Sequence, residues 1–105
     1  MMIVKTKLSK DLLKPIIQLD VNSDREKLYE ILSKSNFVVQ EICYQNSCKI
    51  KLKYDKFEFE IRSVAMIGWS LSERINGTMQ PSLIDHYDLR VIVATIVKDL
   101  ISRDL

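Results

Sequence analysis

The chain has 105 residues, of which 47% are hydrophobic and 29% are charged, a balance typical of one globular domain. Its 16 Lys and Arg residues exceed its 14 Asp and Glu residues by a formal charge of +2, which excludes a strongly basic nucleic-acid protein. The sequence shows neither the apolar core of a signal peptide at its start nor a run of about 18 apolar residues that could span a membrane. We therefore expect a single cytoplasmic domain over residues 1–105 that does not contact a membrane.

The first segments of the chain predict a tail followed by a strand. Residues 1–8 are expected to form either a mobile tail or an additional edge strand. Pro15 precedes the run IIQLDV, whose apolar and β-branched residues are typical of a strand. Proline is tolerated at the first position of a strand because the missing backbone donor costs little there.

A first helix is predicted from about Asp24 to Ser35. Ser23 stands three residues before Glu26, the spacing at which each side chain satisfies a free backbone donor at a helix start. The apolar residues of this segment form one narrow stripe, which consists of Leu28, Ile31 and Leu32. One side of the helix is therefore expected to pack and the other to remain in water.

The run FVVQEICY predicts an extended segment that ends in a turn near Asn46. The two cysteines lie on either side of this turn. A two-residue turn at Asn46 and Ser47 would place Cys43 opposite Ile50, whereas a four-residue turn would place Cys43 opposite Cys48 and allow a disulfide. We expect free thiols, because the chain has no secretory signal and no Cys-x-x-Cys motif of a redox or zinc site.

A β-hairpin is predicted from Lys49 to Arg62, with its turn at Asp55 and Lys56. This register places the apolar residues of both strands on one face and the charged residues on the other. The predicted apolar pairs are Tyr54 with Phe57, Leu52 with Phe59, and Ile50 with Ile61. The predicted charge pairs are Lys53 with Glu58 and Lys51 with Glu60, which leaves Lys49 opposite Arg62 as a like-charge pair.

The segment after the hairpin allows two interpretations. Residues 63–80 either prolong the last strand to about Ile67 and then form a short helix, or fold back as another strand, with a turn at Asn76 and Gly77. From Ser82 to Leu105 the chain has no Gly or Pro, and Ser82 with Asp85 forms a plausible capping pair, so a second main helix is predicted. The β-branched run at 91–97 keeps a strand as the alternative for part of this segment.

These elements predict an α+β fold in the order β-α-β-β-β-α. The sheet is expected to be an antiparallel meander of three to four strands, with two main helices packed on one face.

The residues that could carry chemistry point away from an enzyme. His86 lies between Asp85 and Asp88, as a general base oriented by a carboxylate would, but acidic residues are also expected at a helix start because they complement the helix dipole. The chain has only two glycines, so it lacks a glycine-rich phosphate loop. We predict no catalytic, cofactor-binding or metal-ligating residues.

The second helix carries the candidate interface. Its apolar residues spread around much of the helix circumference, whereas a helix lying on one sheet buries only about half of it. Either the first helix and residues 64–75 cover the remainder, or a second copy or another subunit does. The predicted interface residues are Leu89, Ile92, Val93, Ile96, Leu100 and Trp69, although a lone tryptophan is also a common core anchor. The favoured function is a non-catalytic interaction subunit, which forms a homodimer or docks on a larger assembly through this helix and a sheet edge.

The alternative function is a small RNA-binding or other nucleic-acid-binding accessory protein. It would use the lysine-rich face of the hairpin, formed by Lys49, Lys51, Lys53, Lys56 and Arg62, together with Lys5, Lys7 and Lys10. The cross-strand charge pairs count against it, because a phosphate groove normally needs cations that no carboxylate neutralises.

Overall fold

The computed structural model describes residues 8–20 and 25–103. The elements in chain order are η1 (Lys10–Leu12), α1 (Leu13–Ile17), α2 (Arg25–Lys34), β1 (Phe37–Tyr44), β2 (Ser47–Tyr54), β3 (Phe57–Val64), β4 (Gly68–Ile75), β5 (Thr78–Met79), β6 (Ile84–His86) and α3 (Leu89–Ser102). The prediction of a tail or edge strand over residues 1–8 lies outside the described residues, except at Leu8. Ser23, the predicted cap of the first helix, also lies outside them.

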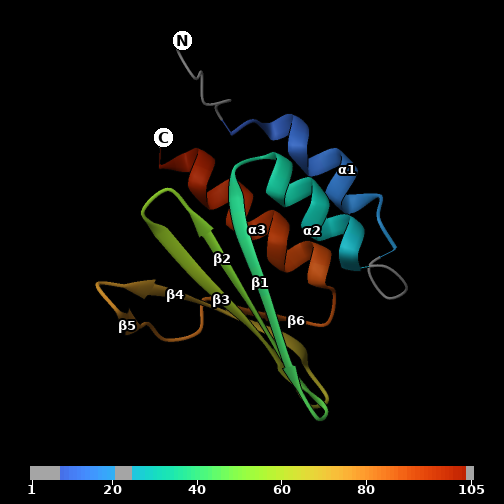
Figure 1. The fold of residues 1–105 in the computed structure, drawn as a ribbon, viewed down its shortest axis with the longest axis vertical. Helices are drawn as coiled ribbons and strands as arrows, with labels where there is room; N and C mark the ends of the chain where they lie inside the picture. Colours follow the sequence, from blue (N-terminus) through green and yellow to red (C-terminus); the bar gives the residue numbers. More distant parts are fainter. Residues whose placement is uncertain (1–7, 21–24, 104–105) are drawn as a thin grey trace.

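The fold is an antiparallel sheet with its α-helices on one face (Figure 1). Five of the six strands follow the order β1-β2-β3-β4-β5. The sixth, β6, pairs with the same edge of β4 as β5 does, but β5 pairs with the end of β4 and β6 with its beginning. The α+β class and the antiparallel sheet are confirmed. The predicted strand count of three to four and the predicted element order are wrong, because residues 64–86 contribute three further strands and the first element is helical. No helix among the described residues is long and apolar enough to cross a membrane.

The first predicted strand is instead the short helix α1. Leu8, Leu12, Ile16 and Leu19 follow one another at intervals of four, four and three residues, which place them on one face of a helix. Ile16 is fully buried and the other three pack against the core. Pro15 fits here because it lies within the first turn, where its missing N–H has no helical acceptor to lose.

The register of the β2–β3 hairpin is confirmed at every predicted pair, from Tyr54 with Phe57 to Lys49 with Arg62. Asp55 has a φ of 52° at the turn, a left-handed conformation that Asp tolerates better than most residues. Of the two interpretations of the following segment, the returning strand is the one observed, as β4. The turn at Asn76 and Gly77 is also observed, with φ values of 52° and 78°.

The prediction of free thiols is wrong, because Cys43 and Cys48 form a disulfide. The turn between β1 and β2 consists of Gln45 and Asn46, one residue earlier than the turn that was predicted to separate the thiols. This turn places Cys43 directly opposite Cys48, with 4.1 Å between their Cα atoms. The disulfide therefore joins the two strands at the end of the sheet that projects beyond the helices in Figure 1.

The last helix is confirmed, but it begins later than predicted. Asp88, not Ser82, is its N-cap, and the Asp88 carboxylate accepts a hydrogen bond from the Arg90 backbone N–H. The preceding residues extend along β4 as β6. The start of β4 lies so close to this segment that a Cβ on Gly68 would come within 2.4 Å of the Tyr87 Cα. Only glycine fits there, which explains how Trp69 and His86 become neighbours across the sheet.

Candidate interaction surface on the open side of the sheet

The interface residues predicted on α3 are core residues. Leu89, Ile92, Val93, Ile96 and Leu100 are at most 2% exposed within the single chain. The sheet covers one side of α3, and α1 packs against another side. These side chains are therefore not available to a partner while the chain is folded, and the need for a second copy to cover them disappears.

Trp69, the remaining predicted interface residue, packs partly buried against the core. The Arg25 guanidinium of α2 lies 5.7 Å from the centroid of its ring. This contact holds α2 against β4 by a cation–π interaction. Trp69 therefore serves as a core anchor, which was the alternative interpretation of a lone tryptophan.

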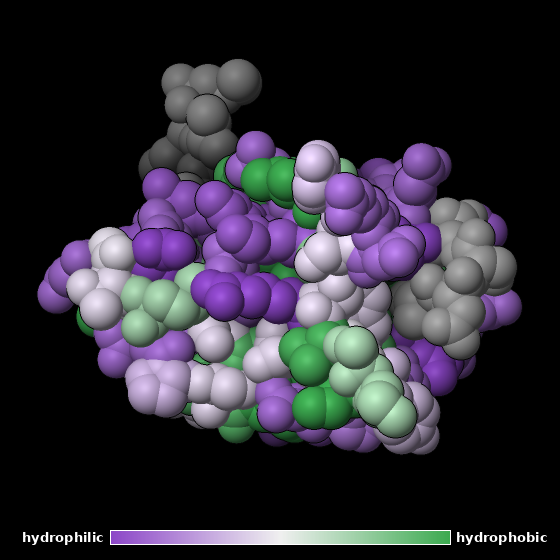
Figure 2. All heavy atoms as spheres, turned by 90° about the horizontal axis from the view of Figure 1, so that it is seen from below, coloured by the Kyte–Doolittle hydropathy of each residue, from purple (hydrophilic) through white to green (hydrophobic). Residues whose placement is uncertain are grey.

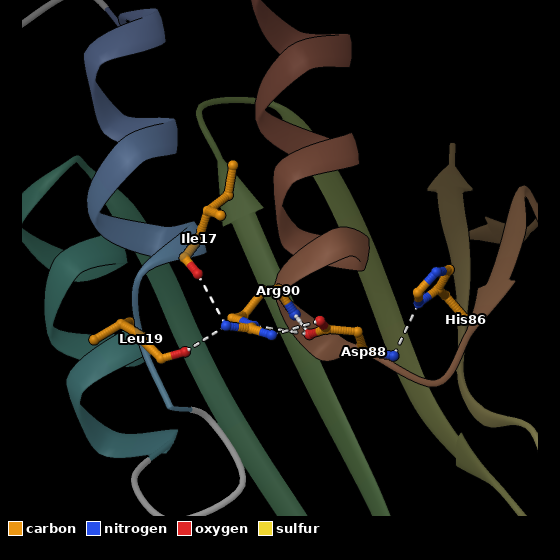
Figure 3. A network of polar contacts seen from close by, with 5 residues as sticks. All are labelled: Ile17, Leu19, His86, Asp88 and Arg90. Carbon is orange, nitrogen blue, oxygen red and sulfur yellow. Dashed lines mark hydrogen bonds and ion pairs between the residues drawn. The ribbon is translucent and has the colours of Figure 1, made fainter.

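A polar network fixes the start of α3 to the end of α1 (Figure 3). The Arg90 guanidinium donates hydrogen bonds to the carbonyl oxygens of Ile17 at 2.9 Å and Leu19 at 3.0 Å. It also binds the Asp88 carboxylate, with 2.8 Å between Nη2 and Oδ2. Hydrogen bonds from Arg90 hold the pKa of Asp88 below its ordinary value. Arg90 thus satisfies backbone carbonyl oxygens at the end of α1 and just beyond it.

His86 belongs to the same polar network. Its Nδ1 accepts a hydrogen bond of 2.9 Å from the Asp88 backbone N–H, and its ring stacks on Tyr87 with 4.6 Å between centroids. The Asp88 carboxylate is directed to Arg90 rather than to the imidazole, as Figure 3 shows. Within residues 8–20 and 25–103, no three His, Cys, Asp or Glu side chains are grouped as metal ligands.

The strand β1 is an edge strand of the sheet that the described residues form. Within the described part of the chain it pairs with β2 alone, over all eight of its residues. Val38, Ile42 and Tyr44 are 66%, 45% and 75% exposed. Because side chains alternate between the faces of a strand, all three lie on the face opposite the helices. We call this face the open side.

Further apolar residues gather at the end of the sheet that carries the β1–β2 and β3–β4 turns. Met66 and Ile67 lie in the β3–β4 turn, and both are exposed. The strand register places this turn at the same end of the sheet as Tyr44. Figure 2 looks at this end of the molecule and shows a group of apolar residues in a surface that is otherwise largely hydrophilic. Exposed apolar residues therefore gather on β1 and at these turns.

The lysine-rich face is arranged differently from the predicted ladder of charge pairs. Glu60 lies opposite Lys51 in the register, but its carboxylate contacts Arg62 at 2.7 Å, Arg74 at 3.8 Å and Lys49 at 3.9 Å. Its side chain is only 3% exposed. Glu60 thus binds three cations at once, and among the described carboxylates none lies within 4.0 Å of the Lys51 ammonium.

A cavity of about 280 Å³ opens on this face. It is lined by Val38, Gln40, Lys51, Leu52, Lys53, Glu58, Phe59, Glu60 and Arg74. Of the predicted nucleic-acid residues, only Lys51 and Lys53 line it, and Lys49 and Arg62 adjoin it through Glu60. Lys56 lies at the β2–β3 turn, with its ammonium 5.6 Å from the centroid of the Phe57 ring. The predictions for Lys5 and Lys7 lie outside the described residues.

Sequence reasoning missed Arg74, Val38 and Gln40 as members of this surface. Arg74 lies opposite Glu58, so pairing β4 with β3 in register would have placed it beside the lysines. That step requires the β3–β4 turn, which the sequence left open between two interpretations. Searches against known protein families, curated proteins and solved structures found no match to this chain.

Proposed function

We propose that this chain is a non-catalytic interaction subunit that forms a homodimer by pairing its β1 strand with β1 of a second copy. The single observation that carries this proposal is the free β1 edge with three exposed apolar side chains. A strand edge offers a row of unpaired backbone donors and acceptors, which another extended chain can satisfy.

The composition of β1 supports this use of its edge. Monomeric proteins usually protect a long edge strand with Lys, Pro or a bulge, and FVVQEICY contains neither Lys nor Pro. Its one carboxylate, Glu41, is engaged within the chain, because it accepts a hydrogen bond from the Tyr29 hydroxyl and pairs with Arg25 at 3.5 Å. The edge therefore carries no free charge that would oppose pairing.

The sequence of β1 is also self-complementary in antiparallel pairing. With the two-fold axis at Gln40, Val38 lies opposite Ile42 of the second copy, and this apolar contact occurs twice on the open side. On the helix side, Val39 lies opposite Glu41 of the second copy, whose carboxylate keeps its own Arg25 and Tyr29. A shift of the axis to Glu41 would instead bring two carboxylates together, so the Gln40 register is favoured.

The test is the mass in solution of the wild-type chain and of the double variant Val38→Lys/Ile42→Lys, measured by size-exclusion chromatography with light scattering. The wild type is expected at twice the chain mass of 12.3 kDa, and the variant at the chain mass, because lysines on an edge strand oppose pairing. Ile75→Lys is the matched control, since Ile75 is 46% exposed and Ile42 45%, but Ile75 lies at the end of β4. A wild type that stays monomeric at its highest soluble concentration, or a double variant that remains a dimer, contradicts the proposal.

A further inference from the structure

We propose that the open-side cavity is a binding site for a phosphate group, held by Lys51, Lys53 and Arg74. The observation behind it is the convergence of three cations from two different strands on a cavity of about 280 Å³. This volume lies near the lower end of the range for small-molecule sites, roughly 300 Å³, so it suits a phosphate and part of the group attached to it. The inference does not depend on the proposed homodimer.

The charge of the molecule is concentrated on this face. The register places five cationic side chains on the open side, namely Lys49, Lys51, Lys53, Arg62 and Arg74. Three carboxylates share the face with them, namely Glu58, Glu60 and Asp85. The surplus of two positive charges equals the formal charge of the whole chain, +2, so the rest of the chain is neutral in sum. An anion is therefore attracted to this face.

Glu60 arranges the cations instead of neutralising the cavity. A single buried carboxylate holds Arg62, Arg74 and Lys49 within 4.0 Å, so the group of four keeps a surplus positive charge. Arg74 is fixed further by a hydrogen bond of 2.9 Å from its Nη1 to the Gly77 carbonyl oxygen. Glu60 is thus a positioning residue, which holds a guanidinium at the wall of the cavity before a ligand arrives.

Lys51 and Lys53 supply the charges that a ligand can neutralise. Both side chains are exposed, and within the described residues neither ammonium forms an ion pair. They stand two residues apart on one strand and therefore on the same face. Lysine and arginine are the side chains that proteins use for phosphate, because both donate charge-assisted hydrogen bonds to its oxygens. Val38 and Gln40 line the cavity as well, where they can contact the remainder of the ligand.

The same phosphate chemistry has two sources, a free nucleotide and the backbone of a single-stranded nucleic acid. The test therefore titrates two probes, uridine monophosphate and an oligouridylate of about ten nucleotides, against ¹⁵N-labelled protein at about 50 mM salt. Saturable shifts of the amide signals of Lys51, Lys53 and Arg74 are expected with at least one probe. A free-nucleotide site binds both probes with similar affinity, whereas a backbone site binds the oligonucleotide far more tightly and loses affinity steeply with salt.

The variants decide whether this cavity is the site. Lys51→Gln/Lys53→Gln is expected to weaken binding by about tenfold or more, because each replacement removes one charge-assisted contact. Lys14→Gln/Lys98→Gln removes the same charge from exposed positions on the helices and is expected to change the affinity less than about twofold. The absence of saturable binding by both probes overturns the proposal, as does an equal loss of affinity in the two double variants.

Discussion

Glu60 and Glu73 are both buried carboxylates in neighbouring strands, yet they lie on opposite faces of the sheet and differ in their partners. Glu73, 7% exposed on the helix side, is bound by one guanidinium, with 2.9 and 2.5 Å between its oxygens and the Arg103 nitrogens. Glu60, 3% exposed on the open side, is shared by three cations. Arg103 also binds Asp99 at 2.7 Å, so the first arrangement places one cation between two carboxylates, whereas the second keeps an excess of positive charge at the surface.

This difference extends to the two faces as a whole. On the helix side, apolar packing, the Glu73–Arg103 pair and the Arg90 network serve the fold. The Arg103 guanidinium also lies 4.9 Å from the centroid of the Phe57 ring, so it caps the core at the C-terminal end of α3. On the open side, exposed apolar residues, a cavity and unpaired lysines are left over after folding. We therefore expect changes on the helix side to lower stability and changes on the open side to alter binding.

The largest effect is expected for Ile92→Ala in α3. Ile92 is fully buried, so truncation should lower the free energy of unfolding by about 3 kcal/mol through lost burial and a new cavity. Val91→Ala, at a neighbouring position that is 36% exposed, should cost less than about 1 kcal/mol. Urea denaturation measures both values. Similar small losses in the two variants would mean that α3 is not packed within the chain.

An intermediate effect is expected for the two buried carboxylates. Glu73→Gln should destabilise the chain by about 2 kcal/mol, because a buried amide cannot replace the two charge-assisted contacts with Arg103, which then keeps only its contact with Asp99 at 2.7 Å. Glu60→Gln should cost less than about 1 kcal/mol. Its three cationic partners are partly exposed, so water can solvate their charges once the carboxylate is removed. Denaturation midpoints of the two variants compare them directly. Equal losses would remove the distinction between the two faces.

The smallest effect is expected for Asp88, whose replacement should change how the melting temperature depends on pH in acid. The pKa of Asp88 is lowered from its ordinary value of 3.8, mainly by hydrogen bonding with Arg90. A carboxylate with a lowered pKa stabilises the fold above its unfolded-state pKa, and this contribution is lost as the pH falls through the folded-state pKa. The melting temperature of the wild type should therefore fall more steeply below about pH 4 than that of Asp88→Asn, which keeps a capping side chain. Parallel pH profiles of the two proteins would contradict this role for Asp88.

Local patterns in the sequence predicted the central part of the fold. The β2–β3 register follows from alternation and a two-residue turn, and a slip by one residue would have exposed apolar side chains of the hairpin. Helix α2 follows from its apolar stripe, of which Leu28 and Leu32 are fully buried. These elements depend on residues close together in sequence, and for that reason a single sequence was sufficient.

The main errors came from contacts between distant segments. Pro15 favoured a strand where α1 is found, so α1 was not counted among the elements that could cover the apolar circumference of α3, and an interface was favoured there over a cover by the first helix and residues 64–75. The position of one turn, Gln45 with Asn46, decided between free thiols and a disulfide. Arg74 joins Lys51 only through the pairing of β4 with β3. In each case the missing information was a long-range packing or register that no local pattern supplied.

The most direct test of the account is hydrogen–deuterium exchange of the wild-type chain, measured by mass spectrometry in dilute and in concentrated solution. We predict that exchange in β1 slows at high concentration because its free edge becomes paired, while α3 is protected equally in both solutions. Exchange in α3 that slows with concentration, with β1 unchanged, would contradict the account and return the interface to the helix.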